Sequence, residues 1–172
     1  MFLKFIKSIG LKKNIKKSLA QYEPEVLSGM VNTIGVLTDE TYVADTRLID
    51  EIARYGFKKE AVSLLVYRKK VSAKEAETIN YRYFTKKDIS AGGDFKGEAA
   101  GFINTPFDLL ISYYDVEKPV LVLATLQSKA KFKVGFSSVN KLYNSFTINI
   151  TADKYKEFIA ELFKYLKILN KI

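Results

Sequence analysis

Short apolar runs alternate with segments of helical periodicity along most of this chain. Two segments place apolar residues three or four positions apart and are predicted to be helices: 43–56 and 152–169. Periodicity leaves 118–129 ambiguous, and Pro119 at a first helical turn together with the run Leu123, Ala124 and Leu126 favours a helix there. Six runs rich in β-branched and aromatic residues are predicted to be strands: 33–37, 61–68, 81–84, 107–114, 131–136 and 145–150. The alternation predicts an α/β fold, a three-layer Rossmann-like sandwich around a mostly parallel sheet of about six strands.

The chain begins with a different pattern, in which lysines separate apolar residues at helical spacing. The segment MFLKFIKSIGLKKNIKKSLA at 1–20 contains no acidic residue, and Gly10 is expected to break or bend its helix. Its six lysines are Lys4, Lys7, Lys12, Lys13, Lys16 and Lys17. A connector, QYEPEVLSGM, follows it. We therefore predict a basic amphipathic helical extension at 1–22 and a single α/β domain at 31–172.

Most of the positive charge lies in that first segment. The chain has a net charge of +9, and beyond the six lysines it holds 22 basic against 19 acidic residues. Three interpretations of the segment stay open. It is a helix docked on the protein's own domain or solvated, an arm for RNA or another anionic partner such as a ribosomal assembly, or a helix lying on an anionic membrane surface.

The composition removes several kinds of chemistry. The chain has neither cysteine nor histidine, which excludes disulfides, thiolate nucleophiles, histidine bases and nearly all zinc sites. We predict no metal or cofactor, and an enzyme would have to use Asp, Glu, Lys, Tyr or Ser. No apolar run reaches the roughly 18 residues that suggest a membrane-spanning helix. A cytoplasmic protein is expected, or one held peripherally at the inner membrane.

Candidate chemistry lies where predicted strands end, because ligands of open α/β sheets bind outside the carboxyl ends of the strands. Asp39 and Asp45 follow the first strand and are the candidate catalytic carboxylates. Asp45 is equally suited to cap the next helix.

The one long irregular stretch predicted is KKDISAGGDFKGEAAG at 86–101. Backbone amides near glycines can hold an anion, which makes this stretch a candidate ligand loop. Its candidate residues are Gly92, Gly93, Lys96 and Gly97. The alternative is a flexible surface loop, since the stretch matches no phosphate-binding fingerprint.

The stretch FDLLISYYDVEKPVLVLATLQSKAKFKVGF at 107–136 resembles part of the N-terminal Rossmann-like half of the heptosyltransferase-type glycosyltransferases. That part runs from an "FD-L-I-D" strand through a helix to an "AK-RVG" strand. The likeness extends to 33–52, where that family has a strand, a catalytic acid in the following loop and a helix. It implies a nucleotide sugar or envelope precursor as ligand and an acid near Asp39. The family's "LGD" turn is absent from this chain.

Over its full length the chain resembles a family of uncharacterised proteins of about this size from flavobacteria and their relatives. The resemblance rests on KKNIKKSL, FDLLISYY, SKAKFKVGF and the last predicted helix. Our first hypothesis is a non-catalytic adaptor that binds an anionic macromolecule, RNA or a ribosomal assembly, through the six lysines. The alternative is a membrane-peripheral, glycosyltransferase-like protein that uses Asp39 or Asp45 as a base.

Overall fold

The computed structural model of the chain describes residues 2–24, 26–42 and 47–172, without the side chains of residues 2–9. Its sheet consists of β1 (Ile34–Asp39), β2 (Val62–Tyr67), β3 (Arg82–Phe84), β4 (Leu109–Tyr113), β5 (Phe132–Phe136) and β6 (Phe146–Ile148). The strands pair in the order β3-β2-β1-β4-β5-β6, and every pairing is parallel. This is the doubly wound Rossmann order: successive strands are added toward one edge of the sheet from β1 to β3 and toward the other edge from β4 to β6, so the order reverses between β1 and β4. The predicted fold class is confirmed.

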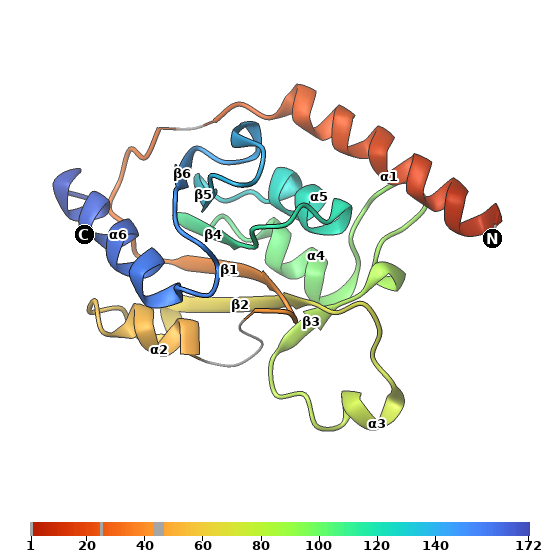
Figure 1. Cartoon of the computed structure of the whole chain (residues 1–172), viewed down its shortest axis with the longest axis horizontal. Helices are drawn as coiled ribbons and strands as arrows, with labels where there is room; N and C mark the ends of the chain where they lie inside the picture. The colour runs from red at the N-terminus through yellow and green to blue at the C-terminus, as the bar shows by residue number, and fades with distance from the viewer. Residues whose placement is uncertain (1, 25, 43–46) are drawn as a thin grey trace.

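Helices cover both faces of the sheet (Figure 1). They are α1 (Phe2–Gln21), α2 (Arg47–Ala53), α3 (Ala73–Ala76), α4 (Gly97–Asn104), α5 (Pro119–Gln127) and α6 (Tyr155–Ile168). Three short 3₁₀ turns are η1 (Lys59–Ala61), η2 (Lys86–Asp88) and η3 (Lys141–Tyr143). The helices α2 and α6 pack on one face of the sheet, and α4 and α5 pack on the other.

The central strands are apolar on both faces because each face meets a layer of helices. In β1, Val36 belongs to the core beneath α2 and α6, whereas Leu37 belongs to the core beneath α4 and α5. Leu110 and Ile111 of β4 divide between the two cores in the same way. Successive side chains of a strand point to opposite faces, so a sheet covered on both sides requires continuous apolar runs.

Helix α5 is buried all round, and α1 provides its outer cover. Residues 120–126 of α5 are all buried. The sheet covers one side of the helix, and α1 packs on α5 through a stripe of apolar residues: Leu11, Ile15, Leu19 and Tyr22. A helix that is apolar on every side must be buried on every side. The α1–α5 contact meets that requirement.

Two predictions about local structure are wrong. The helix α1 runs unbroken through Gly10, where a Cβ atom would lie 3.7 Å from the carbonyl oxygen of Ala91, so the small residue sits where α1 passes another segment. The stretch predicted to be irregular at 86–101 contains η2 and the start of α4, whose small residues pack closely on the sheet.

The division into an extension at 1–22 and a domain at 31–172 stays a prediction. No helix among the described residues is long and apolar enough to cross a membrane.

Candidate functional site

The carboxyl end of β1 brings Asp39 against the start of α5. Asp39 is the last residue of β1 and is 1% exposed. Its Oδ1 accepts a hydrogen bond of 2.6 Å from the backbone N–H of Thr41, and its Oδ2 accepts one from the ammonium of Lys118. Lys118 immediately precedes α5 and follows β4. The ion pair therefore joins the two strands between which the order of the sheet reverses, where α/β proteins bind ligands.

The contacts of Asp39 favour its ionised form. Burial alone would raise the pKa of this carboxyl group, but the hydrogen bonds from Lys118 and Thr41 and the charge of Lys118 lower it below its ordinary value. A carboxylate with a lowered pKa and both oxygens engaged is a weak base. The arrangement favours a structural role for Asp39, which holds the loop after β1 against the start of α5. The other candidate carboxylate, Asp45, lies outside the described residues.

Further polar pairs continue along this edge of the sheet. The hydroxyl of Tyr42 donates to Asp115, and burial together with that carboxylate raises the pKa of Tyr42. Arg68, next to the end of β2, donates from Nε to Glu40 at 3.1 Å and from Nη1 to the Tyr81 hydroxyl at 3.1 Å. The carboxyl edge is thus a row of mutually satisfied polar groups.

A cleft of about 540 Å³ lies beside this row, where β4, β5 and β6 end. Its lining groups also bond to one another, because Ser138 donates to the Asp115 carbonyl and Ser137 donates to the Asn149 side chain, each at 3.0 Å. Sequence reasoning did not identify Lys118 or Arg68. Both residues lie in segments that leave the carboxyl ends of strands, Arg68 after β2 and Lys118 after β4, and that position could have identified them.

A second carboxylate ties the opposite edge of the sheet together and adds to the acid sensitivity of the fold. Oδ2 of Asp108 accepts the backbone N–H groups of Asn32 and Thr33 at 3.0 Å each, and Oδ1 accepts Lys131 at 2.8 Å. Burial would raise the pKa of Asp108, but these partners lower it below its ordinary value.

We expect the free energy of unfolding to decrease as the pH falls. With lowered pKa values in the folded state, Asp39 and Asp108 bind fewer protons there than in the unfolded chain, so acid favours unfolding. Their stabilisation is present above about pH 4 to 5 and is lost below it. Urea titrations between pH 7 and pH 3 should show a smaller decrease in Asp108→Asn than in the wild type. An unchanged decrease would contradict this account, and the exposed Glu60→Gln serves as control.

The helix α1 presents a face of lysines away from the fold. Leu11, Ile15 and Leu19 pack toward α5, and the lysines on the other side of the helix are exposed: Lys12, Lys13, Lys16 and Lys17. We call these four residues the lysine face. Among the described residues none of the four forms an ion pair, and α1 contains no acid. Lys4 and Lys7 belong to the same helix, and their side chains lie outside the description.

The glycine loop lies against α1. Gly93 is buried and has a φ of +90°, and a Cβ atom there would lie 2.3 Å from the side-chain nitrogen of Asn14. Its carbonyl accepts a hydrogen bond of 3.2 Å from Gln127 of α5. Gly93 thus allows α1 to dock. Gly92, Lys96 and Gly97 are exposed, and a role of this loop in anion binding stays a prediction.

Comparison with known proteins places the whole of this architecture in one family. The family of unknown function DUF6913 matches residues 7–169. The chain belongs to DUF6913. No curated protein and no solved structure matches it. The predicted resemblance to an uncharacterised family is confirmed, and the likeness to glycosyltransferases stays a prediction.

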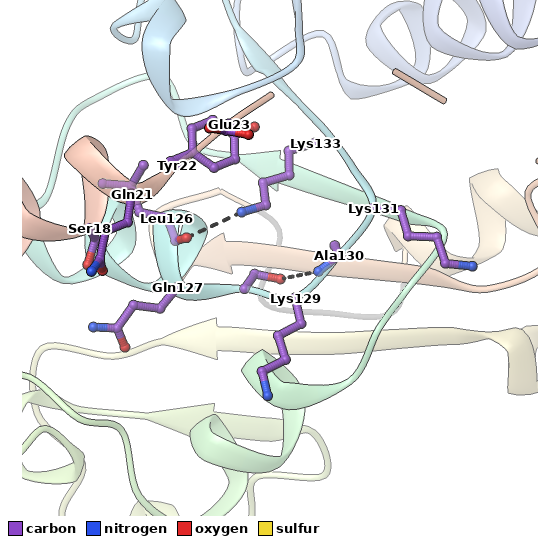
Figure 2. A pocket seen from close by; sticks show the side chains of 11 residues that line it. Ser18, Gln21, Tyr22, Glu23, Leu126, Gln127, Lys129, Ala130, Lys131 and Lys133 are labelled. Atoms are coloured by element: carbon purple, nitrogen blue, oxygen red, sulfur yellow. Dashed lines mark hydrogen bonds between the residues drawn. The ribbon is translucent and has the colours of Figure 1, made fainter. Parts of the chain in front are cut away.

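The DUF6913 match includes α1 from residue 7 onward, together with the sheet and α6. The lysine face and the Asp39–Lys118 pair therefore both lie within the matched region. A cavity of about 340 Å³ lies within it too, between the C-terminal ends of α1 and α5 (Figure 2).

Proposed function

We propose that this DUF6913 protein is a non-catalytic adaptor that binds RNA through the lysine face of α1. The observation that carries the proposal is the division of α1 into an apolar side packed on α5 and an exposed lysine side without an ion-pair partner among the described residues. Lys12, Lys13, Lys16 and Lys17 recur at helical spacing, so their ammonium groups lie on one side of the helix.

The charge of the lysine face predicts which class of ligand it binds. Four uncompensated lysines on one surface attract a polyanion, and each phosphate they neutralise releases a counterion. Lysine is a point charge without the bidentate geometry of arginine, so the contact favours the phosphate backbone over the bases. Binding should therefore be sequence-tolerant and strongly dependent on salt.

The docking of α1 favours RNA over a bilayer. An interfacial helix binds a membrane by burying its apolar side in the headgroup region. In α1 the residues that would enter the bilayer, Leu11, Ile15 and Leu19, pack against the core that contains the buried residues of α4 and α5. The side left for a partner is cationic and carries no large apolar group among residues 10–21.

The contacts of Asp39 support a binding role over catalysis. A glycosyltransferase-like mechanism with Asp39 as base needs an accessible carboxylate with a raised pKa. Asp39 is buried, paired with Lys118 and has a lowered pKa. A nucleotide sugar that raised the melting temperature would speak for the enzyme alternative, because a ligand selective for the folded state stabilises it.

The experiment measures RNA affinity against salt. A variant with all four residues of the lysine face changed to glutamine should bind a single-stranded RNA of about 20 nucleotides roughly 10²-fold more weakly at 0.15 M salt. The slope of log affinity against log salt should lose about 3 units of magnitude, because each phosphate contact contributes about 0.7 for single strands. Fluorescence anisotropy of labelled RNA gives both quantities.

A matched control removes the same charge from the opposite side of the molecule. Four exposed lysines there lie after α2 or on α6: Lys58, Lys156, Lys164 and Lys167. Changing them to glutamine should leave most of the affinity and the salt slope in place. Equal losses in the two variants would reduce the effect to net charge and contradict the proposal. Binding of anionic vesicles in place of RNA would contradict it as well.

A further inference from the structure

The cavity between α1 and α5 lies at the C-terminal end of the helix that carries the lysine face. Its volume of about 340 Å³ is within the range of small-molecule sites, roughly 300–1,000 Å³. Figure 2 shows groups of several kinds around it, among them the ring of Tyr22, the amide of Gln21 and the ammonium of Lys133. An extended polyanion bound along α1 would reach this cavity next.

Lys133 forms a fixed, buried cation at one wall of the cavity. The residue is 2% exposed, and its Nζ donates to the Thr125 carbonyl at 2.8 Å and to the Leu126 carbonyl at 3.4 Å. These carbonyls belong to the C-terminal end of α5, where the helix dipole favours a cation. The same ammonium lies 4.4 Å from the centroid of the Tyr22 ring. Tyr22 is thereby held in place, and its hydroxyl bonds to Ser145 at 3.3 Å.

The two remaining lysines of the cavity differ in whether their ammonium groups are available to an anionic ligand. Lys131 forms an ion pair with Asp108 at 2.8 Å, and Figure 2 shows its side chain directed away from Tyr22. Lys129 is exposed and forms no ion pair among the described residues. Its ammonium is therefore available to an anionic ligand at the edge of the cavity, since Figure 2 shows that this side chain, too, is directed away from Tyr22.

We propose that this cavity binds one nucleotide of the RNA that follows the lysine face, which makes the inference dependent on the proposed function. Lys129 contacts the phosphate, and the Tyr22 ring provides an aromatic surface for the base. The side-chain amide of Gln21 offers a donor and an acceptor to the base edge, and that of Gln127, whose nitrogen already donates to the Gly93 carbonyl, offers its oxygen as an acceptor. Basic and aromatic groups side by side are the usual composition of single-stranded RNA sites.

The carboxylate of Glu23 argues for a nucleotide over a bare anion. Glu23 lines the cavity and is exposed, so it repels inorganic phosphate placed nearby. A nucleotide carries hydroxyl and amino groups as well as phosphate, and those donors can face Glu23 while the phosphate faces Lys129. The cavity thus has complementary groups for both ends of a nucleotide.

The test uses nucleoside 5′-monophosphates with the full chain, followed by amide chemical shifts in NMR titrations. AMP, GMP, CMP and UMP, each at millimolar concentration, should shift the amides of 18–23 and 126–131 in a saturable way. Lys129→Gln should weaken this binding about fivefold, since it removes one charge-assisted phosphate contact. Gln21→Ala should weaken it less, and both side chains are accessible enough for the variants to fold. The exposed Lys58→Gln should have no effect.

The outcomes separate the two proposals. Equal shifts with inorganic phosphate alone would overturn the nucleotide assignment, and so would shifts confined to residues away from the cavity. Absence of monophosphate shifts, with RNA binding that still depends on the lysine face, would overturn the cavity assignment and leave the proposed function standing. If the chain binds no RNA, the proposed function fails, and the assignment of an RNA nucleotide fails with it.

Discussion

Phe158→Ala is expected to lower the free energy of unfolding by about 3–5 kcal/mol, because it removes a fully buried ring and leaves a cavity. Phe158 of α6 is 0% exposed, and its ring lies 4.5 Å from that of Phe136 and 5.3 Å from that of Tyr113. These three aromatic rings fix α6 on the sheet. The hydroxyl of Tyr113 also donates to the carbonyl of Ala152, which anchors the turn before α6.

Urea unfolding measures this loss, and for a chain of this length it corresponds to a decrease of roughly 10 °C in the melting temperature. Phe158→Leu should cost much less, because leucine refills part of the space. Ile168→Ala, at a position of the same helix that is 63% exposed, should change stability by less than about 0.5 kcal/mol. Comparable losses in Phe158→Ala and Ile168→Ala would contradict the placement of α6.

The strands and the last helix could be predicted because their patterns follow from burial. The strands β1, β2 and β4 form continuous apolar runs since helices cover both faces of the sheet. The helix α6 has one apolar stripe since only one side of it meets the sheet. In these elements the local sequence and the tertiary environment require the same pattern.

The start of α4 could not be predicted, because its sequence GEAAGFIN is rich in glycine and small residues that signal a loop. Tertiary packing overrides that preference: Ala99 and Phe102 are buried against the sheet, and close packing needs the small side chain. Helix propensity is a weak guide where packing decides.

The sequence of α5 indicated that another element, which is α1, covers it. An amphipathic lysine-rich helix has the same pattern whether its apolar side covers its own domain, a partner or a membrane, so residues 1–20 by themselves left these alternatives open. The apolar character of 120–126 on every side was the informative feature. A helix of this kind needs a second cover besides the sheet, and α1 is that cover.

Of the Asp39–Lys118 pair, only Asp39 could be identified from the sequence. Asp39 was a candidate because it follows a strand, but 79 residues separate it from its partner. The sequence pattern does not specify which strand lies beside β1, so it could not bring Lys118 to Asp39. The sheet order supplies that information, because β1 and β4 are neighbours.

Lys118→Met is expected to lower the free energy of unfolding by about 3 kcal/mol at neutral pH. Removing the lysine leaves the carboxylate of Asp39 buried without a compensating charge, which costs about 3–5 kcal/mol for a fully buried pair. The lower end applies, because the Lys118 side chain is 38% exposed and water can replace part of its interaction. Thermal and urea unfolding of the variant measure the loss.

Two further observations separate loss of the ion pair from loss of packing. The double variant Asp39→Asn/Lys118→Met removes both charges and should regain most of the stability, because a neutral pair leaves no buried charge uncompensated. Acid should also narrow the difference between Lys118→Met and the wild type. Protonation relieves the unpaired carboxylate of the variant, whereas in the wild type the ion pair keeps the pKa of Asp39 low and acid removes its stabilisation. A deficit that is independent of pH and persists in the double variant would show that Lys118 stabilises the fold through its aliphatic chain instead of its charge.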